Sequence, residues 1–158
     1  MNLESERLLS MRGEVPEEEY LIPFGQARIA RAGTDCTIVA FGRMVNIALE
    51  VGMELEKEGI SCEVLDMRTI RPLDAGSIIR SVKRTGACVV VDQSWSFGSP
   101  GSEVAALVHR ECFDDLDNYV HRVHSADVPA PYAHNLEQEY LPNARRIAEA
   151  VRSCLYRS

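Results

Sequence analysis

Three short apolar runs rich in β-branched residues alternate with stretches of helical periodicity in the middle of the chain. The runs CTIVAFG, SCEVLDM and ACVVVDQ occupy residues 36–42, 61–67 and 87–93. Runs of this length and composition, bounded by turn residues, predict buried β-strands. Residues 44–58 carry apolar side chains at helical spacing, and residues 74–85 begin with an aspartate, a residue type that caps helices. The pattern predicts two strand–helix units followed by a third strand.

Weaker patterns flank this central alternation. They predict a short edge strand near residues 27–31, a helix at about 101–112 and a last strand at 119–124. The proline-containing stretch that follows, including His134, is predicted as a long loop. A closing helix is predicted at 143–156.

The regular succession of strands and helices predicts the fold class. Cys36, Cys62 and Cys88 each stand near the start of an apolar strand, 26 residues apart, which is the length of one strand–helix unit. Such units require right-handed crossovers and cover both faces of the sheet with helices. We therefore predict an α/β fold, a three-layer α/β/α domain with a mostly parallel five-stranded sheet, whose edge strand at 27–31 runs antiparallel. The cysteines are predicted to be small core side chains.

Composition limits the classes of partner. The chain has 158 residues, enough for one domain with a full core, and its net charge is −7. This charge argues against nucleic acid and against an anionic membrane as main partner, and it permits a basic partner. No apolar run approaches the roughly 18 residues of a membrane span. Five cysteines, an odd number, favour a reducing compartment over a disulfide framework.

No motif supplies a recognisable catalytic, cofactor-binding or metal-binding site. The fingerprint GxGxxG, the P-loop and the nucleophile elbow GxSxG are absent. His121 and His124 are three residues apart on a predicted strand, so their side chains face opposite ways and cannot easily share an ion. The loop 93–102 leaves two interpretations open: an anion site made by free amides, or ordinary turn and cap residues.

Charged residues follow the predicted strand ends. Asp66 and Asp92 stand at the ends of two strands. They could act as paired acids or could accept hydrogen bonds from loop amides, and we favour the second interpretation. After Asp66 comes the sequence MRTIRPLD, in which Arg68 and Arg71 can fork onto carbonyl or carboxylate oxygens. Asp74 then starts a helix. We interpret Arg68, Arg71 and Asp74 as a structural joint.

Several stretches, taken in order, resemble one family. GISCEVLDMRTIRPLD is similar to the carboxyl-terminal, transketolase-type domain of the beta subunit of the pyruvate dehydrogenase decarboxylating component. LESERLL, YLIPFGQARIARAGTDCTIVAFG, SVKRTGACVVVDQSW, GSEVAALV and SADVPAPYAHNLEQEYLPN continue the resemblance across nearly the whole chain. ECFDDL is somewhat like the branched-chain 2-oxoacid dehydrogenase form, and acetoin dehydrogenase is another close relative. SWSFGSPGSE departs from the glycine-rich sequence that the family has at this place, which leaves the contacts of that loop open.

The resemblance implies a transketolase C-terminal-domain-like fold within a larger enzyme. It implies that residues 1–20 are a connector from a missing pyrimidine-binding domain and that residues 21–158 are the domain itself. In the family, thiamine diphosphate and magnesium lie between the missing domain and the alpha subunit. The resemblance therefore implies no catalytic, cofactor-binding or metal-binding residue in this piece. The parent enzyme would decarboxylate pyruvate and acetylate lipoyl groups, in the bacterial cytoplasm or the mitochondrial matrix.

The resemblance also implies three protein partners: the alpha subunit, a second beta subunit, and the peripheral subunit-binding module of the dihydrolipoyl acetyltransferase. Asp117 falls where beta subunits present an acid to that basic module, and His121 flanks it. Asp114 and Asp115 precede Asp117, and clustered acids speed encounter with a basic partner. A solvated loop explains this acidic run equally well. A stand-alone nucleotide- or anion-binding α/β module is the alternative to an assembly domain.

Overall fold

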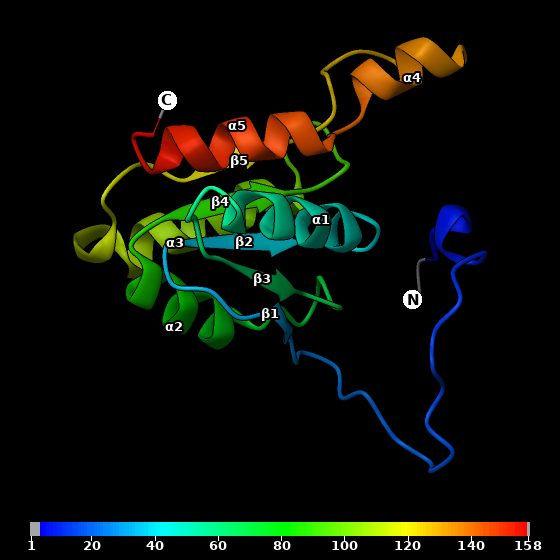
Figure 1. Cartoon of the computed structure of the whole chain (residues 1–158), viewed down its shortest axis with the longest axis horizontal. Helices are drawn as coiled ribbons and strands as arrows, with labels where there is room; N and C mark the ends of the chain where they lie inside the picture. The colour runs from blue at the N-terminus through cyan, green and yellow to red at the C-terminus, as the bar shows by residue number, and fades with distance from the viewer. Residues whose placement is uncertain (1–3, 158) are drawn as a thin grey trace.

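The β-branched runs form the strands of one sheet in the computed structural model, which describes residues 4–157 (Figure 1). The sheet has five strands in the order β1-β3-β2-β4-β5. Strand β1 pairs antiparallel with β3, and the other pairs are parallel. The predicted fold class and the antiparallel edge strand are confirmed. The strands are β1 (Arg28–Arg31), β2 (Cys36–Ala40), β3 (Cys62–Asp66), β4 (Cys88–Val91) and β5 (His121–Val123).

Helices cover both faces of the sheet. Figure 1 shows α1 and α5 on one side of the strands and α2 and α3 on the other. Each layer encloses its own apolar cluster, one beneath α1 and α5 and one beneath α2 and α3. The predicted core cysteines are all buried and free. The helices are α1 (Met44–Glu56), α2 (Ala75–Thr85), α3 (Pro100–Glu111), α4 (His134–Tyr140) and α5 (Ala144–Cys154), with short 3-10 turns η1 (Glu6–Leu8) and η2 (Phe113–Asp115).

Two predicted elements need correction. The long loop predicted before the closing helix contains α4, so His134 begins a helix instead of lying in a loop. Helix α4 has no buried residue, and it therefore lacks the apolar stripe by which sequence periodicity reveals a helix. The last strand is shorter than predicted and begins at His121. The amides just before it are bonded outside the sheet, that of Tyr119 to the side chain of Asn118 at 2.8 Å and that of Val120 to Nε2 of His109 at 3.4 Å.

The chain before β1 runs outside the layers. Residues 12–24 arch away from the body of the molecule in Figure 1, and no backbone hydrogen bond is described for them. Arg7 returns to the body through an ion pair with Glu137 of α4 at 2.5 Å. The connector predicted for residues 1–20 stays a prediction, and residues 1–3 of it lie outside the described residues.

Candidate docking surface

The aspartates at the strand ends hold loop backbone. Asp92 is buried and accepts hydrogen bonds from the amides of Ser94 at 3.0 Å and Gly101 at 2.7 Å. Asp66 accepts from the amide of Arg68 at 3.2 Å. These contacts confirm the interpretation of both residues as ligands of loop amides.

The start of α3 is also occupied by the chain itself. Ser99 caps the helix by accepting from the amide of Ser102 at 3.1 Å, while Asp92 takes the amide of Gly101. Arg122 closes the loop from the sheet side with a hydrogen bond to the carbonyl of Ser96 at 2.9 Å. Since these amides are already bonded, the geometry favours the cap-and-turn interpretation of loop 93–102 over an anion site. The same contacts leave this loop a poor fit for the diphosphate of a cofactor.

The stretch after β3 holds the incoming chain. Asp74 caps α2 through the amide of Ser77 at 3.0 Å and also accepts from the amide of Ala27 at 2.9 Å. Thr69 accepts from the amide of Gly25 at 3.1 Å. Burial alone would raise the pKa of Asp74, but the hydrogen bonds from Ala27 and Ser77 outweigh it and hold the pKa below its usual value. Asp74 and Thr69 thus fix the chain where it enters β1.

The two arginines of this stretch make no described hydrogen bond to the incoming chain. Arg68 has a positive φ of 54°, and its Nε lies 3.9 Å from the carboxylate of Asp66. Arg71 is exposed, and no hydrogen bond or ion pair from its side chain occurs within residues 4–157. The joint predicted from Arg68, Arg71 and Asp74 stays a prediction. Of these three residues, Asp74 is the one whose side chain holds the backbone of another element. Sequence reasoning missed Thr69, whose role depends on a contact with a residue far away in the chain.

Asp117 lies on a turn at the opposite end of the strands, where β4 begins, and two hydrogen bonds hold its backbone. The amide of Asp117 donates to the carbonyl of Gly86 at 2.9 Å, and the carbonyl of Asp117 accepts from the hydroxyl of Tyr156 at 3.1 Å. Its carboxylate lies against Gly86, where a Cβ atom would come within 2.6 Å of Oδ2. Gly86 is the left-handed cap residue of α2, with a φ of 69°. The α2 cap and the chain's last aromatic residue therefore position the exposed Asp117 side chain.

The charges of the acidic run are not equivalent. Asp115 pairs with Lys83 of α2 at 2.9 Å. In residues 4–157, no lysine, arginine or histidine forms an ion pair with Asp114 or Asp117. Three largely exposed aromatic side chains lie near these acids along the chain or in contact with the turn: Phe113, Tyr119 and Tyr156, at 73%, 64% and 75% exposure. An unpaired carboxylate beside exposed rings is a surface suited to a basic protein partner.

His121 contacts this surface through the ring of Tyr119. Its ring stacks on Tyr119 with centroids 4.2 Å apart, and the side chain is 8% exposed. Its Nε2 is buried without a hydrogen-bond partner in the described structure. Burial lowers the pKa of His121, so the neutral imidazole is favoured. The flanking role predicted for His121 stays a prediction, and Tyr119 presents the ring that faces solvent.

The comparisons with known proteins agree with this fold. The family model described as transketolase, C-terminal domain, matches residues 25–147. The chain belongs to this family. A solved structure titled split gene transketolase, inactive beta4 tetramer, superposes with a TM-score of 0.76 at 32% identity, over 91% of this chain and 46% of that one.

Curated relatives narrow the resemblance within the family. The pyruvate dehydrogenase E1 component subunit beta of Rickettsia felis is 44% identical over 156 residues, which is 99% of this chain and 48% of the relative. The mitochondrial subunit of Dictyostelium discoideum is 41% identical over 99% of this chain and 45% of the relative. The 2-oxoisovalerate dehydrogenase subunit beta of Bacillus subtilis is 39% identical over 90% of this chain and 44% of the relative. The resemblance stated from the sequence is confirmed, and the chain spans about half the length of these relatives.

Two further findings concern the described residues only. Residues 4–157 contain no group of three or more His, Cys, Asp or Glu side chains arranged to hold a metal ion. None of the helices described is both long enough and apolar enough to pass through a membrane.

Proposed function

We propose that this chain is the C-terminal assembly domain of a pyruvate dehydrogenase beta subunit. The parent enzyme would use thiamine diphosphate and magnesium to decarboxylate pyruvate and would acetylate lipoyl groups. This domain would contribute no catalytic residue. It would organise the alpha subunit and a second beta subunit, and it would dock the peripheral subunit-binding module of the dihydrolipoyl acetyltransferase.

The observation that carries the docking proposal is the setting of Asp117. Its side chain is exposed and has no ion-pair partner within residues 4–157, and its backbone is held by hydrogen bonds to Gly86 and Tyr156. A fixed acid on a protein of net charge −7 favours a basic module through both long-range attraction and a local ion pair. A branched-chain 2-oxoacid or acetoin dehydrogenase beta subunit is the second candidate. It is supported by the similarity to a 2-oxoisovalerate dehydrogenase subunit beta at 39% identity and to an acetoin:2,6-dichlorophenolindophenol oxidoreductase subunit beta at 40%.

The test replaces Asp117 in the full heterotetramer. Asp117→Lys is expected to weaken binding of the subunit-binding module by about 2 kcal/mol or more, because it sets two positive charges against each other at a desolvated contact. Asp114→Lys is the matched control, since it changes the same charge in the same run at a residue that the α2 cap does not hold. Calorimetry should also show weaker salt dependence for Asp117→Lys. Equal affinities and salt slopes for the wild type and Asp117→Lys would remove this residue from the docking surface.

The non-catalytic assignment has its own test. Titration of the chain with thiamine diphosphate and magnesium is expected to give no saturable heat, because the amides at the start of α3 are already bonded to Asp92 and Ser99. Micromolar binding to this chain alone would contradict the assignment and favour a stand-alone anion-binding module.

The proposal includes self-association. The relative of known structure that is 32% identical is titled a beta4 tetramer, so a beta chain of that protein assembles with its own copies. By analogy, copies of this chain would contact one another in the parent enzyme.

A further inference from the structure

Three of the five buried cysteines share one apolar cluster. Cys36, Cys62 and Cys154 belong to the cluster beneath α1 and α5, whereas Cys88 and Cys112 belong to the cluster on the other face of the sheet. Cys36 and Cys62 are in register on neighbouring strands, and Cys154 is the last residue of α5. Thiols that share one layer can react with each other where two of them come into contact.

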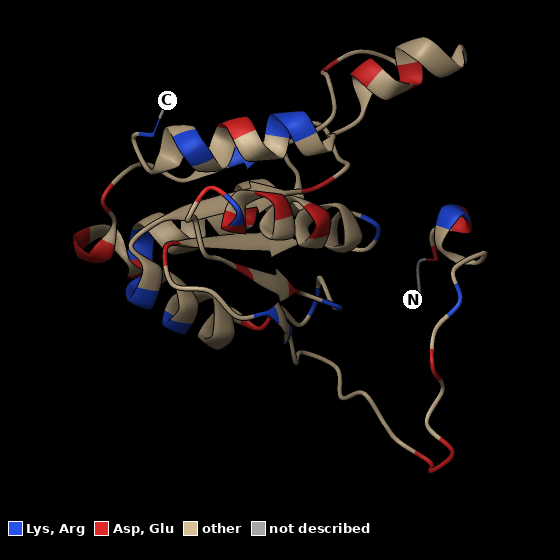
Figure 2. Cartoon of the chain, in the orientation of Figure 1, with Lys and Arg blue, Asp and Glu red and all other residues tan. Residues whose placement is uncertain are grey.

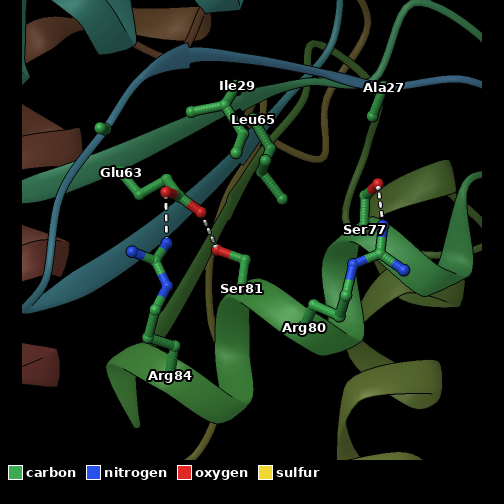
Figure 3. Close-up of a pocket in the computed structure, with 9 residues that line it drawn as sticks. Ala27, Ile29, Glu63, Leu65, Ser77, Arg80, Ser81 and Arg84 are labelled. Atoms are coloured by element: carbon green, nitrogen blue, oxygen red, sulfur yellow. Dashed lines mark hydrogen bonds and ion pairs between the residues drawn. The ribbon is translucent and has the colours of Figure 1, made fainter.

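The buried carboxylates of Glu63 and Asp92 already have partners. Glu63 accepts from Ser81 at 2.5 Å and pairs with Arg84 (Figure 3), and Asp92 holds two loop amides. Strands β2 and β4, by contrast, contain no charged residue (Figure 2). These two strands offer no charge to a thiolate, so the ionisation of a thiol at this place depends on burial and on the thiols next to it.

Cys36 and Cys154 are in contact where α5 ends above the sheet. The thiol of Cys36 donates a hydrogen bond to the sulfur of Cys154. The sulfur of Cys154 lies 3.8 Å from the carbonyl oxygen of Cys88 of β4, and Cys88 is the register partner of Thr37 of β2. The end of α5 therefore lies over the starts of β2 and β4. Two sulfur atoms in this contact have to approach to about 2.0 Å for a disulfide bond to form.

The shared hydrogen bond makes the two thiols different. It lowers the pKa of Cys154 and raises the pKa of Cys36, while burial raises both. Cys154 is therefore the thiol of the pair that ionises first, and the thiolate is the form that peroxide oxidises. Cys36 keeps its proton and stands in contact as the second thiol. An oxidisable thiol beside a second, resolving thiol is the arrangement of redox-sensing cysteines.

The end of α5 that carries Cys154 also holds the turn of the proposed docking surface. The carbonyls of Ser153 and Cys154 accept hydrogen bonds from the side chain of Asn118 at 3.3 and 3.2 Å. The hydroxyl of Tyr156 donates to the carbonyl of Asp117 at 3.1 Å. A movement of Cys154 towards β2 therefore displaces groups to which this turn is bonded.

We propose that Cys36 and Cys154 form a redox switch that hydrogen peroxide closes. The Cys154 thiolate attacks the peroxide, whose O–O bond breaks, so that Cys154 becomes a sulfenic acid and hydroxide leaves. The Cys36 sulfur then attacks the Cys154 sulfur, the S–O bond breaks, and the Cys36 proton leaves with the departing oxygen as water. The two thiols lose two electrons and the peroxide gains them. The disulfide draws the end of α5 towards β2 and loosens the turn that carries Asp117.

Burial makes this reaction depend on local opening. Both thiols are at most 1% exposed, so peroxide reaches Cys154 when the last turn of α5 opens. Local opening of an element end requires less free energy than unfolding of the whole domain. The native reaction is therefore confined to this pair, whereas reaction through the unfolded chain would oxidise all five cysteines alike.

The first experiment maps the disulfide in the chain itself, so it does not depend on the proposed function. The folded chain is treated with a graded series of hydrogen peroxide, blocked with N-ethylmaleimide and digested without reductant for mass spectrometry. One linkage is expected, between the peptides that contain Cys36 and Cys154. Cys36→Ala is expected to leave a sulfenic acid on Cys154 that dimedone traps, and Cys154→Ala is expected to leave Cys36 unmodified. Cys112→Ala is the matched control, because it removes an equally buried thiol from the other face and should form the linkage as the wild type does.

Three results of this mapping would overturn the inference. The first is no linkage between Cys36 and Cys154 in the folded chain. The second is oxidation of all five cysteines at one rate, which indicates reaction of the unfolded chain. The third is a sulfenic acid that dimedone traps on Cys36 in place of Cys154, which contradicts the roles assigned to the two thiols.

The second experiment measures the turn by hydrogen exchange in the reduced and the oxidised chain. The amide of Asp117 donates to the carbonyl of Gly86, so its exchange reports how firmly the turn is held. Exchange at residues 117–120 is expected to become about fivefold faster or more on oxidation and to return to its first value after reduction with dithiothreitol. Unchanged exchange in the oxidised chain would end the switch even where the disulfide forms.

The third experiment measures docking in the heterotetramer, and this part of the inference rests on the proposed function. Oxidation is expected to weaken binding of the subunit-binding module about fivefold or more. Because such coupling is reciprocal, a saturating module should raise the reduction potential of the disulfide by the equivalent of that factor, about 20 mV for a two-electron couple. Equal affinity of a binding module for both states would overturn the switch. A module that binds neither state would instead contradict the docking proposal, and the mapping and exchange results would then decide the switch.

Discussion

At the scale of single residues, positions fixed by backbone geometry matter more than the charged residues that stand out in the sequence. Asp117 is one of three acids in a short run, and its distinction comes from Gly86, whose missing side chain leaves room for the carboxylate. Tyr156 then fixes the same turn from the end of the chain. Neither contact follows from local sequence, because both join residues far apart along the chain.

Gly86→Ala is expected to damage both stability and docking. A φ of 69° disfavours any side chain by about 1–2 kcal/mol, and the new Cβ would lie 2.6 Å from the Asp117 carboxylate and displace it. Gly59→Ala is the control, because Gly59 has a φ of 77° and no atom within 4 Å of its Cβ position. Urea unfolding should show a loss in both variants, larger for Gly86→Ala. Docking affinity should fall only in Gly86→Ala, and equal docking in the two variants would contradict this account.

At the scale of elements, the joint after β3 ties a helix cap to the entry of a strand. Asp74 accepts from α2 and from the amide that leads into β1, so one carboxylate connects two elements of different layers. The hydrogen bonds that make this connection also lower the pKa of Asp74. A carboxylate whose folded pKa lies below its unfolded value near 3.9 adds stability above that value, and the added stability is lost as the pH falls through the folded pKa.

Replacing Asp74 therefore has two measurable effects. Asp74→Ala is expected to cost about 1 kcal/mol of unfolding free energy at neutral pH, as for other lost helix caps. Asp74→Asn keeps an oxygen acceptor but cannot titrate, so its stability should fall less steeply than that of the wild type as the pH drops below about 4. Urea unfolding between pH 3 and 7 measures both. Parallel stability curves for the wild type and Asp74→Asn would show that the carboxylate charge contributes nothing.

The elements that sequence reasoning found are those with a buried face. The β-branched runs from Cys36, Cys62 and Cys88 end in buried strands because their composition suits a sheet covered on both sides. Helix α4 was missed for the opposite reason, since it buries nothing and shows no apolar period. The proposed docking role of Asp117 came from family resemblance, whereas the aromatic residues around it depend on tertiary contacts that periodicity does not encode.

At the scale of the whole molecule, the two ends of the parallel strands carry different surfaces. Gly86 precedes β4, so Asp117 lies at the end where the parallel strands begin. Trp95 follows β4 at the opposite end, and its Nε1 donates to the hydroxyl of Tyr140 of α4 at 3.1 Å. Phe97, Tyr132 and Leu136 are largely exposed around this second end. We expect a helix without buried residues beside exposed aromatic side chains to be covered by a partner chain in the proposed assembly.

The two surfaces should therefore respond to different partners in hydrogen exchange. Amides of α4 are expected to exchange fast in the isolated beta chain, because the helix has no buried residue, and to become at least about tenfold slower in the heterotetramer, where the alpha subunit would cover them. Addition of the subunit-binding module should then protect residues 113–121 and leave α4 unchanged, since Asp117 and Trp95 stand at opposite ends of the strands. Exchange in α4 that is equally fast before and after assembly would refute the prediction that a partner covers this end of the strands. Protection of α4 by the module alone would show that docking reaches across the sheet, against the separation of surfaces argued from the topology.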